Sequence, residues 1–337
     1  MTNDFTSNMK NTIMFKEINQ APESVRKTLD SVEDECTYAS ELIRESKYIY
    51  IVGSGTSYHA GMILQIRLLN RGIPAITVKA PEFSYFLPEG QDSDVTAILI
   101  SQSGESRDIL DSLYAAKDRG FSTVCITNSR DSSLSVGSDI SIVTEAGREN
   151  ALAATKTFIT ALASINMITE KLDEPNSEVG KALPQELKNY LAAETDKVIE
   201  VAKSVKDKVV VLGNGPLHAL ALEGALKFKE TSTMETEAYP IREYLHGPIQ
   251  SLNHDTTVIL LHKPGDEVGA VLEQLQNQTG SIIKVGFSGE DDLMIREVSD
   301  LHLPALMVLP LQLMANYKSV SLGLDPDHPQ HLTKIVK

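Results

Sequence analysis

The sequence predicts an α/β protein that consists of two doubly wound parallel-sheet subdomains related by an internal repeat. Short apolar segments of strand length alternate with helical patterns of about ten to fifteen residues, an alternation typical of parallel sheets. The segment YIVGSG at 50–55 also matches VVLGNG at 210–215, a shift of 160 residues. Because both segments place an apolar strand before a glycine-rich turn and a helix, the chain reads as two copies of one unit.

The first copy contains five expected strands, each a short apolar run. Residues 1–13 are polar and expected to be frayed, and 14–46 carry a helical pattern that should break at Pro22. Helices are expected from the first glycine-rich turn through Leu69, from the turn after residue 100 to Lys117, and from about Leu152 to Leu172. The strands are expected at 48–52, 75–79, 95–100, 124–127 and 140–143.

The second copy repeats this pattern after a segment with the composition of a linker. Its strands are expected at 209–212, 257–261 and 282–285, and a short apolar segment at 301–304 and a helix from about Val308 complete it. The expected domains are an N-terminal helical segment (1–46), a first α/β domain (47–172), a linker (173–195) and a second α/β domain (196–337).

The charge balance limits the partners that the chain can bind. Its 31 Lys and Arg residues against 46 Asp and Glu residues give a net charge of −15, which argues against nucleic acid or an anionic membrane as a partner. Cys36 and Cys125 are the only cysteines, too few for a disulfide scaffold or a Cys-rich zinc site. Residues 1–20 lack the apolar core of a signal peptide, and no run has the length that spans a bilayer. We therefore expect a cytoplasmic protein.

Two loops that follow expected strands are suited to bind an anion. GSGTS at 53–57 and SQSGES at 101–106 lie where a parallel strand meets a helix, and the backbone N–H groups and the helix dipole there favour a phosphate. Neither loop ends in the Gly-Lys-Ser/Thr of a P-loop, and the first has Tyr58 in place of the third glycine of a dinucleotide-binding turn. A phosphomonoester fits better than a nucleotide; the alternative is that both loops are only helix caps and turns.

The stretch 219–248 gathers three side chains that can hold or move protons. Its first part has the apolar spacing of a helix, and Lys227 and Glu230 lie three residues apart on that helix, side by side. His246 follows in a His-Gly-Pro corner, where a helix cannot easily continue. A solvated Lys–Glu pair and an ordinary surface histidine are the alternative interpretation.

Six motifs together resemble a known family. GSGTSYHAG, SQSGESRD, ALAATK, ALEGALKFKE, EYLHGP and the terminal DHPQHLTK are similar, in order and spacing, to the paired sugar isomerase (SIS) domains of glucosamine-6-phosphate synthase and of its stand-alone relatives, which include archaeal-type glucosamine-6-phosphate deaminases. The resemblance runs from about Met14 to the end of the chain and implies two flavodoxin-like SIS domains, the first of which carries the phosphosugar-binding loops.

The resemblance also implies a role for each matching residue. Glu230 matches the carboxylate that moves a proton between C1 and C2 of the sugar, with Lys227 beside it. His246 matches the ring-opening histidine, which the synthase contributes across a dimer, and Lys334 matches the lysine that forms a Schiff base with the open-chain ketose. The sugar phosphate is expected at Ser57, Ser101, Gln102, Ser103 and Ser106, and the sugar itself beside Ser54, Gly55 and Thr56.

The chain departs from the synthase pattern in two residues and one domain. Ala154 stands where the synthase has Ser, and Ser106 where it has a phosphate-binding Thr. Because Met14 already matches the start of the isomerase half, we expect no glutaminase domain and no use of glutamine.

The leading hypothesis is a glucosamine-6-phosphate deaminase that releases fructose 6-phosphate and ammonia, with no metal or cofactor, as a homodimer with shared active sites. The alternatives are an ammonia-dependent synthase or isomerase, a fructosamine-6-phosphate deglycase, and a non-enzymatic phosphosugar sensor. A sensor normally carries a basic helix-turn-helix segment, which the acidic residues 1–47 do not resemble.

Overall fold

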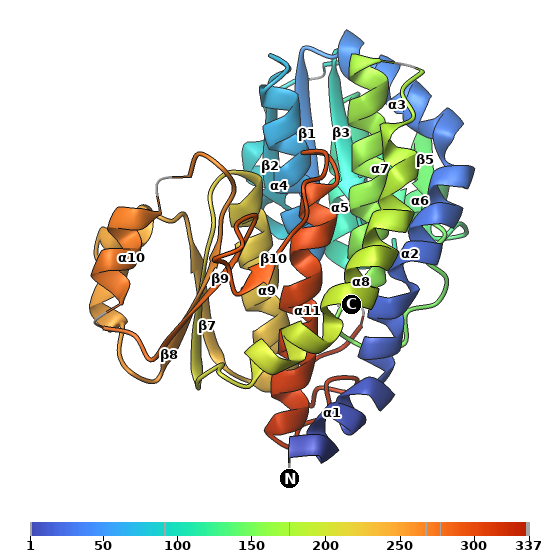
Figure 1. Ribbon diagram of the computed structural model, residues 1–337. Coiled ribbons are helices and arrows are strands. Elements are labelled where there is room, and N and C mark those ends of the chain that lie inside the picture. Colours follow the sequence, from blue (N-terminus) through green and yellow to red (C-terminus); the bar gives the residue numbers. More distant parts are fainter. Residues whose placement is uncertain (1, 91, 175, 267, 277, 335–337) are drawn as a thin grey trace. The chain divides into compact units, whose positions relative to one another are not determined.

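The computed structural model describes residues 2–90, 92–174, 176–266, 268–276 and 278–334 (Figure 1). Its described part contains two five-stranded sheets whose paired strands are parallel. The strand order is β2-β1-β3-β4-β5 in one sheet and β10-β9-β8-β6-β7 in the other. Numbered from the first strand of each copy, both sheets have the order 2-1-3-4-5 of doubly wound folds, so the expected fold class and repeat are confirmed.

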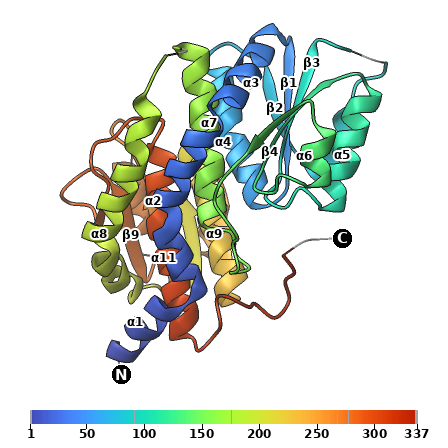
Figure 2. The same ribbon diagram turned by 90° about the vertical axis from the view of Figure 1, so that its right-hand side faces the viewer.

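The strands of the first sheet lie where the sequence predicts them, except that β1 ends one residue later and β4 begins two residues earlier. Figure 2 shows helices α5 (Arg107–Asp118) and α6 (Ser133–Gly137) on one face, and α3 (Glu33–Glu45), α4 (Thr56–Leu69) and α7 (Lys156–Asp173) on the other. A 3-10 helix, η1 (Ala80–Phe86), follows the second strand. The strands are β1 (Tyr48–Gly53), β2 (Ala75–Lys79), β3 (Val95–Ile100), β4 (Ser122–Thr127) and β5 (Ile140–Val143).

The second sheet is built in the same way. Helices α9 (Pro216–Ser232) and α11 (Leu303–Ser321) cover one face, and α10 (Gly269–Leu275) lies on the other (Figure 1). The apolar segment 301–304 leads directly into α11, which begins earlier than the expected Val308. Two 3-10 helices, η3 (Glu243–Leu245) and η4 (Pro248–Ser251), follow β7. The strands are β6 (Lys208–Leu212), β7 (Glu235–Tyr239), β8 (Thr256–Leu261), β9 (Ser281–Gly286) and β10 (Leu293–Met294).

The N-terminal region is more helical than the sequence predicts. Residues expected to be frayed form α1 (Thr2–Asn11), because Met9 is fully buried and the helix packs on α11. The expected break at Pro22 is also wrong, since α2 (Ile13–Ser31) continues through it. The proline removes one backbone donor, but buried apolar side chains on both sides of it hold the helix together. Two further helices, η2 (Val179–Ala182) and α8 (Leu183–Ala202), precede the second sheet.

The chain forms two compact units, each with its own apolar core. Unit 1 comprises residues 1–19, 150–153 and 186–332, and unit 2 comprises 20–149, 154–185 and 333–337. In unit 2, alternate residues of the central strands pack against α5, α6 and η1, as with Val52, Leu99 and Leu113. In unit 1, the equivalent residues of β6 and β8 pack against α10 and η3. Of the helices described, none is both long and apolar enough to cross a membrane.

The glycine-rich turns after β1 and β6 have the same backbone conformation. Gly55 has φ 52° and ψ −125°, and Gly215 has φ 54° and ψ −125°, a left-handed φ that favours glycine. A Cβ atom on Gly53 would lie 2.8 Å from the carbonyl carbon of Ser57, and one on Gly213 would lie 2.5 Å from the oxygen of Leu217. The match that the sequence shows at a shift of 160 residues is therefore a match of backbone geometry.

Candidate functional site

The two predicted anion loops meet at the carboxyl edge of the sheet in unit 2. They follow β1 and β3, which are neighbours at the point where the strand order reverses, the usual ligand position in open parallel sheets. A small cavity of about 50 Å³ lies there. Of the eight residues predicted to bind either the phosphate or the sugar, Thr56, Ser57 and Gln102 line this cavity. Its other polar lining residues are Thr127, Asn128, Thr144 and Thr157, and Ala154 also lines it.

The loop after β3 is tightly held by its own serines. The buried Ser101 accepts a hydrogen bond from the backbone N–H of Gly104 at 3.2 Å, and Ser103 accepts one from Glu105 at 3.3 Å. Gly104 has φ 65°, and a Cβ atom there would lie 2.2 Å from the Ser132 hydroxyl. Only glycine fits this position, because the loop passes close to Ser132, the N-cap residue of α6.

The remaining predicted loop residues lie at the N-termini of two helices. Ser106 is the N-cap residue of α5, and its side chain makes no capping hydrogen bond. Ser54 and Gly55 are exposed immediately before α4. Both helices exceed ten residues, so their N-terminal N–H groups and dipoles favour a negative charge at this edge of the sheet.

Glu230 belongs to a buried charge triad on α9 in unit 1. Lys227 is fully buried, and its ammonium donates to Glu230 at 2.5 Å and lies 3.3 Å from Glu223, which is also fully buried. The alternative of a solvated surface pair is therefore wrong. Burial alone would lower the pKa of the Lys227 ammonium, but the two carboxylates outweigh burial and raise it. Lys227 is thus a buried cation held between two carboxylates.

The Glu230 side chain also lines a cavity of about 510 Å³ within unit 1. This side chain is 20% exposed, whereas those of Lys227 and Glu223 are 0% exposed. One wall is the end of α9, and the other is the C-terminal tail from Gly323 to Leu332. The tail brings in His328 and His331. A carboxylate with one face on a fixed ammonium and the other on open space has the arrangement of a general base.

The tail is anchored beyond α11 by a buried carboxylate. Asp327 accepts hydrogen bonds from the backbone N–H groups of Ile13 and Met14, both at 2.7 Å, at the beginning of α2. His328 bonds Asp325 at 3.0 Å. Burial would raise the pKa of Asp325, but hydrogen bonds from His328 and the backbone lower it. The anchor places the tail along the cavity wall.

His246 occupies the predicted corner. It ends η3, and the following Gly247 has φ 124°, after which η4 begins at Pro248. Its side chain is exposed. Among the described residues that line the cavity at Glu230, His246 is not found.

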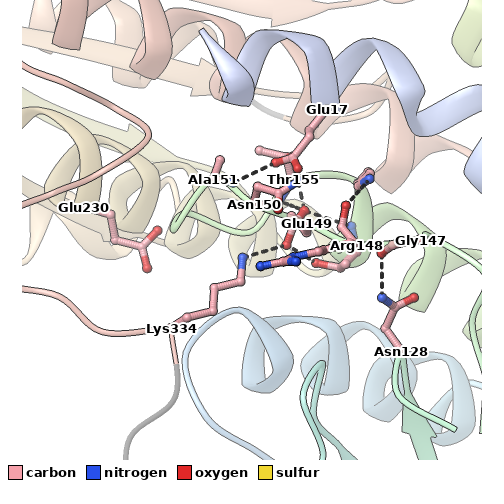
Figure 3. A network of polar contacts seen from close by, with 12 residues as sticks. Glu17, Asn128, Gly147, Arg148, Glu149, Asn150, Ala151, Thr155, Glu230 and Lys334 are labelled. Atoms are coloured by element: carbon pink, nitrogen blue, oxygen red, sulfur yellow. Dashed lines mark hydrogen bonds and ion pairs between the residues drawn. The ribbon is translucent and has the colours of Figure 1, made fainter.

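Lys334 donates a hydrogen bond to Glu149 at 3.1 Å within unit 2 (Figure 3). The Glu149 side chain is fully buried, and it also binds the N-terminus of α7. The hydrogen bonds from the N-terminus of α7 to Glu149 explain why this helix begins at Lys156 and not at the expected Leu152. Residues 149–155 form a loop around the carboxylate.

Sequence reasoning missed several residues that the structure places beside the predicted ones. Glu223 is detectable, because its spacing of four residues from Lys227 puts it on the same helix face. Glu149 lies 185 residues from Lys334, so local spacing carries no signal for that pair. His328 and His331 stand within a motif already noted in the sequence, DHPQHLTK. In the part of the chain that the structure describes, no group of three His, Cys, Asp or Glu side chains is arranged to hold a metal ion.

Comparison with known proteins identifies relatives over nearly the whole chain. A glutamine–fructose-6-phosphate aminotransferase (isomerizing) of Sulfolobus acidocaldarius is 33% identical over 341 residues, which are 96% of this chain and 56% of that protein. The chain thus spans little more than half the length of this curated relative.

Two solved structures are similar in fold and sequence. The C-terminal domain of glucosamine-fructose-6-phosphate aminotransferase from Francisella tularensis is 30% identical with a TM-score of 0.81, covering 94% of this chain and 98% of that one. Glucosamine-6-phosphate deaminase from Thermotoga maritima is 26% identical with a TM-score of 0.82, covering 96% of this chain and 99% of that one. The SIS domain family model matches residues 42–171 and 204–321, one segment for each sheet. The chain therefore belongs to the SIS domain family.

Proposed function

We propose that the protein is an enzyme that acts on a phosphorylated amino sugar, as a glucosamine-6-phosphate deaminase. The observation that carries the proposal is Glu230, which lies on a cavity wall and is fixed from behind by a buried ammonium. The loops at the carboxyl edge of the sheet in unit 2 supply donors for a phosphomonoester. The Thermotoga deaminase and the aminotransferase relatives, whose names refer to hexose 6-phosphates, support the substrate class.

The proposed reaction uses three side chains in sequence. His246 takes the proton of O1 and protonates the ring oxygen, which opens the pyranose. Glu230 then takes the proton from C2 of the amino aldehyde and delivers it to C1, while a proton passes from the amine to O1, which leaves an imine at C2 and a hydroxyl at C1. The Lys334 ammonium passes a proton to the imine nitrogen and adds to C2 as an amine, and ammonia departs. Water then hydrolyses the lysine imine to fructose 6-phosphate and regenerates Lys334. One water is consumed and one ammonia is released.

The experiment that tests this function is a substrate panel with purified protein. We expect glucosamine 6-phosphate to yield fructose 6-phosphate and ammonia in equal amounts, measured by coupled assays. Fructose 6-phosphate with ammonium should run the reaction backward, which is the direction that the names of the aminotransferase relatives favour. Turnover of fructosamine 6-phosphate alone would instead indicate a deglycase, and tight binding of sugar phosphates without turnover in any arm would indicate a sensor. A further arm with glutamine in place of ammonium tests whether glutamine serves as the nitrogen donor.

The phosphate loops give a prediction that separates binding from chemistry. We expect Ser101→Ala and Ser103→Ala each to raise the KM for glucosamine 6-phosphate by roughly tenfold to a hundredfold, because a hydrogen bond to a charged group contributes about 1.5–3 kcal/mol. Residual activity on glucosamine itself should change little. Equal losses on both sugars would mean that the variants had lost loop geometry, since both serines also hold backbone N–H groups.

The exposed His246 gives a prediction about assembly. We propose that it serves the Glu230 cavity of a second copy of the chain, because it projects from a rigid corner and does not line the described wall of the cavity in its own chain. Neither a Glu230→Gln nor a His246→Ala homodimer should then turn over the cyclic substrate. Mixing them under subunit exchange should restore roughly a quarter of wild-type activity, because about half the dimers are mixed and each has one complete site. Verified exchange without recovery would place His246 in the site of its own chain or outside catalysis.

A further inference from the structure

Glu149 is a buried carboxylate with an unusually complete set of donors. One oxygen accepts the backbone N–H of Thr155 at 2.9 Å and of Thr157 at 3.3 Å, and also the Thr155 hydroxyl at 3.3 Å. The other oxygen accepts the Thr157 hydroxyl at 2.7 Å. It also accepts the Lys334 ammonium at 3.1 Å (Figure 3). Four of these five hydrogen bonds come from the beginning of α7, so the carboxylate is held without Lys334.

This arrangement makes Glu149 a fixed anion and Lys334 a removable partner. α7 has 18 residues, and its dipole favours negative charge at its first turn. The Lys334 side chain is 30% exposed, whereas that of Glu149 is 0% exposed. When the lysine leaves, the buried carboxylate keeps four of its five hydrogen bonds, so the departure does not strand an unpaired buried charge.

Residues on both sides fix the loop that carries Glu149. Lys156 is buried and donates to the Gln20 side chain and to the backbone oxygen of Arg148, both at 2.8 Å. The Lys334 side chain is partly exposed, whereas the Glu149 carboxylate is buried and held by the beginning of α7. Glu149 therefore fixes the resting position of the Lys334 ammonium.

We propose that Glu149 is a positioning residue that docks Lys334 for addition to C2 of the open-chain sugar. The proposal rests on the proposed function, in which Lys334 forms an imine with the substrate. Glu149 does not itself contact the sugar in this role. The ammonium of Lys334 stands at the end of a long side chain on a long tail, and Glu149 fixes its starting position. Misplacement of a reacting group by about 1 Å lowers a rate by up to about a hundredfold.

The test is to trap the lysine imine. With fructose 6-phosphate and cyanoborohydride, we expect wild-type protein to gain one hexitol phosphate on Lys334, identified by peptide mass spectrometry. Glu149→Gln should slow this trapping by about tenfold to a hundredfold. Glucosamine 6-phosphate loses its C2 hydrogen through Glu230, not through Lys334. Glu149→Gln should therefore leave the rate of this loss within about threefold of wild type. In a Lys334→Ala background, Glu149→Gln should lower deamination no further, because both changes act on one step.

Glu17→Gln is the matched control. Glu17 is also a buried carboxylate, and it accepts two backbone N–H groups of the neighbouring loop residues, from Asn150 at 2.6 Å and Ala151 at 3.1 Å (Figure 3). We expect it to lower the melting temperature as Glu149→Gln does, but to leave trapping on Lys334 unchanged. Should Glu149→Gln not fold, Glu149→Asp keeps the charge and withdraws it by one methylene, and slower trapping is again expected.

The outcomes separate the two proposals. If wild-type protein forms no adduct on Lys334, the proposed function fails in its imine step. If wild-type protein forms the adduct and the folded Glu149 variants form it equally fast, the positioning role alone is overturned. Losses that add to those of Lys334→Ala, or that Glu17→Gln reproduces, also overturn it, because they would mean a general effect on the loop.

Discussion

Glu230→Gln is expected to abolish turnover of glucosamine 6-phosphate while leaving its affinity within a few-fold of wild type. The amide keeps the shape of the side chain and can still accept the hydrogen bond from Lys227, but it cannot take a proton from C2. A general base contributes about 10²–10⁴ in rate, so kcat should fall by that factor. Affinity is measured by calorimetry and turnover by release of ammonia.

The control for this variant is a change elsewhere on the same cavity wall. Lys229 lines the cavity but is exposed, and Lys229→Gln alters the charge of the wall without touching the triad. If both variants lost turnover to the same degree, or if Glu230→Gln retained it, Glu230 would have only a structural role.

Lys227→Met is expected to destabilise the fold by about 3–5 kcal/mol, because it leaves the Glu223 and Glu230 carboxylates near each other without a cation. Adding Glu223→Gln should recover part of the loss, since it removes the fully buried charge of the two. The free energy of unfolding is measured by denaturant titration.

The exposed Lys229 again supplies the comparison. Lys229→Met removes a lysine from the same helix and should change stability by no more than about 0.5 kcal/mol. If Lys227→Met were equally mild, or if Glu223→Gln deepened its effect, the carboxylates would not depend on Lys227 for their charge balance.

The sequence predicts the fold well because its signals are local. Each central strand is an apolar run buried on both faces, and each glycine-rich turn needs a left-handed residue, as Gly55 and Gly215 show. The edge strand β7 is not predicted from the sequence, because its residues, ETEAY, contain little apolar surface. Only pairing with β6 makes it a strand, and a pattern search along the chain does not detect that pairing.

The errors in the helices also have tertiary causes. A proline predicts a break when the rest of the helix is ignored, but α2 buries Ile18, Ala21 and Val25 around Pro22. The start of α7 moves to Lys156 because the Glu149 carboxylate binds the first N–H groups of the helix. Both effects depend on residues that contact only after folding.

The candidate site was predictable in its chemistry and less so in its geometry. The loop serines and the Lys227–Glu230 pair follow from residue type and spacing. Whether that pair is solvated or buried depends on the packing of α9 against α11, which spacing cannot reveal. The partnership of Lys334 with Glu149 joins residues 185 positions apart and is visible only in the structure.

The measurement that tests the central claim most directly follows the hydrogen on C2. Glucosamine 6-phosphate that carries deuterium at C2 is incubated with the protein, and the label is located by NMR. We predict that the label leaves C2 for C1 or for water with wild-type protein and stays in place with Glu230→Gln. Retention of the label at C2 with wild-type protein, or its loss at equal rates from both proteins, would contradict the proposal that Glu230 moves this proton.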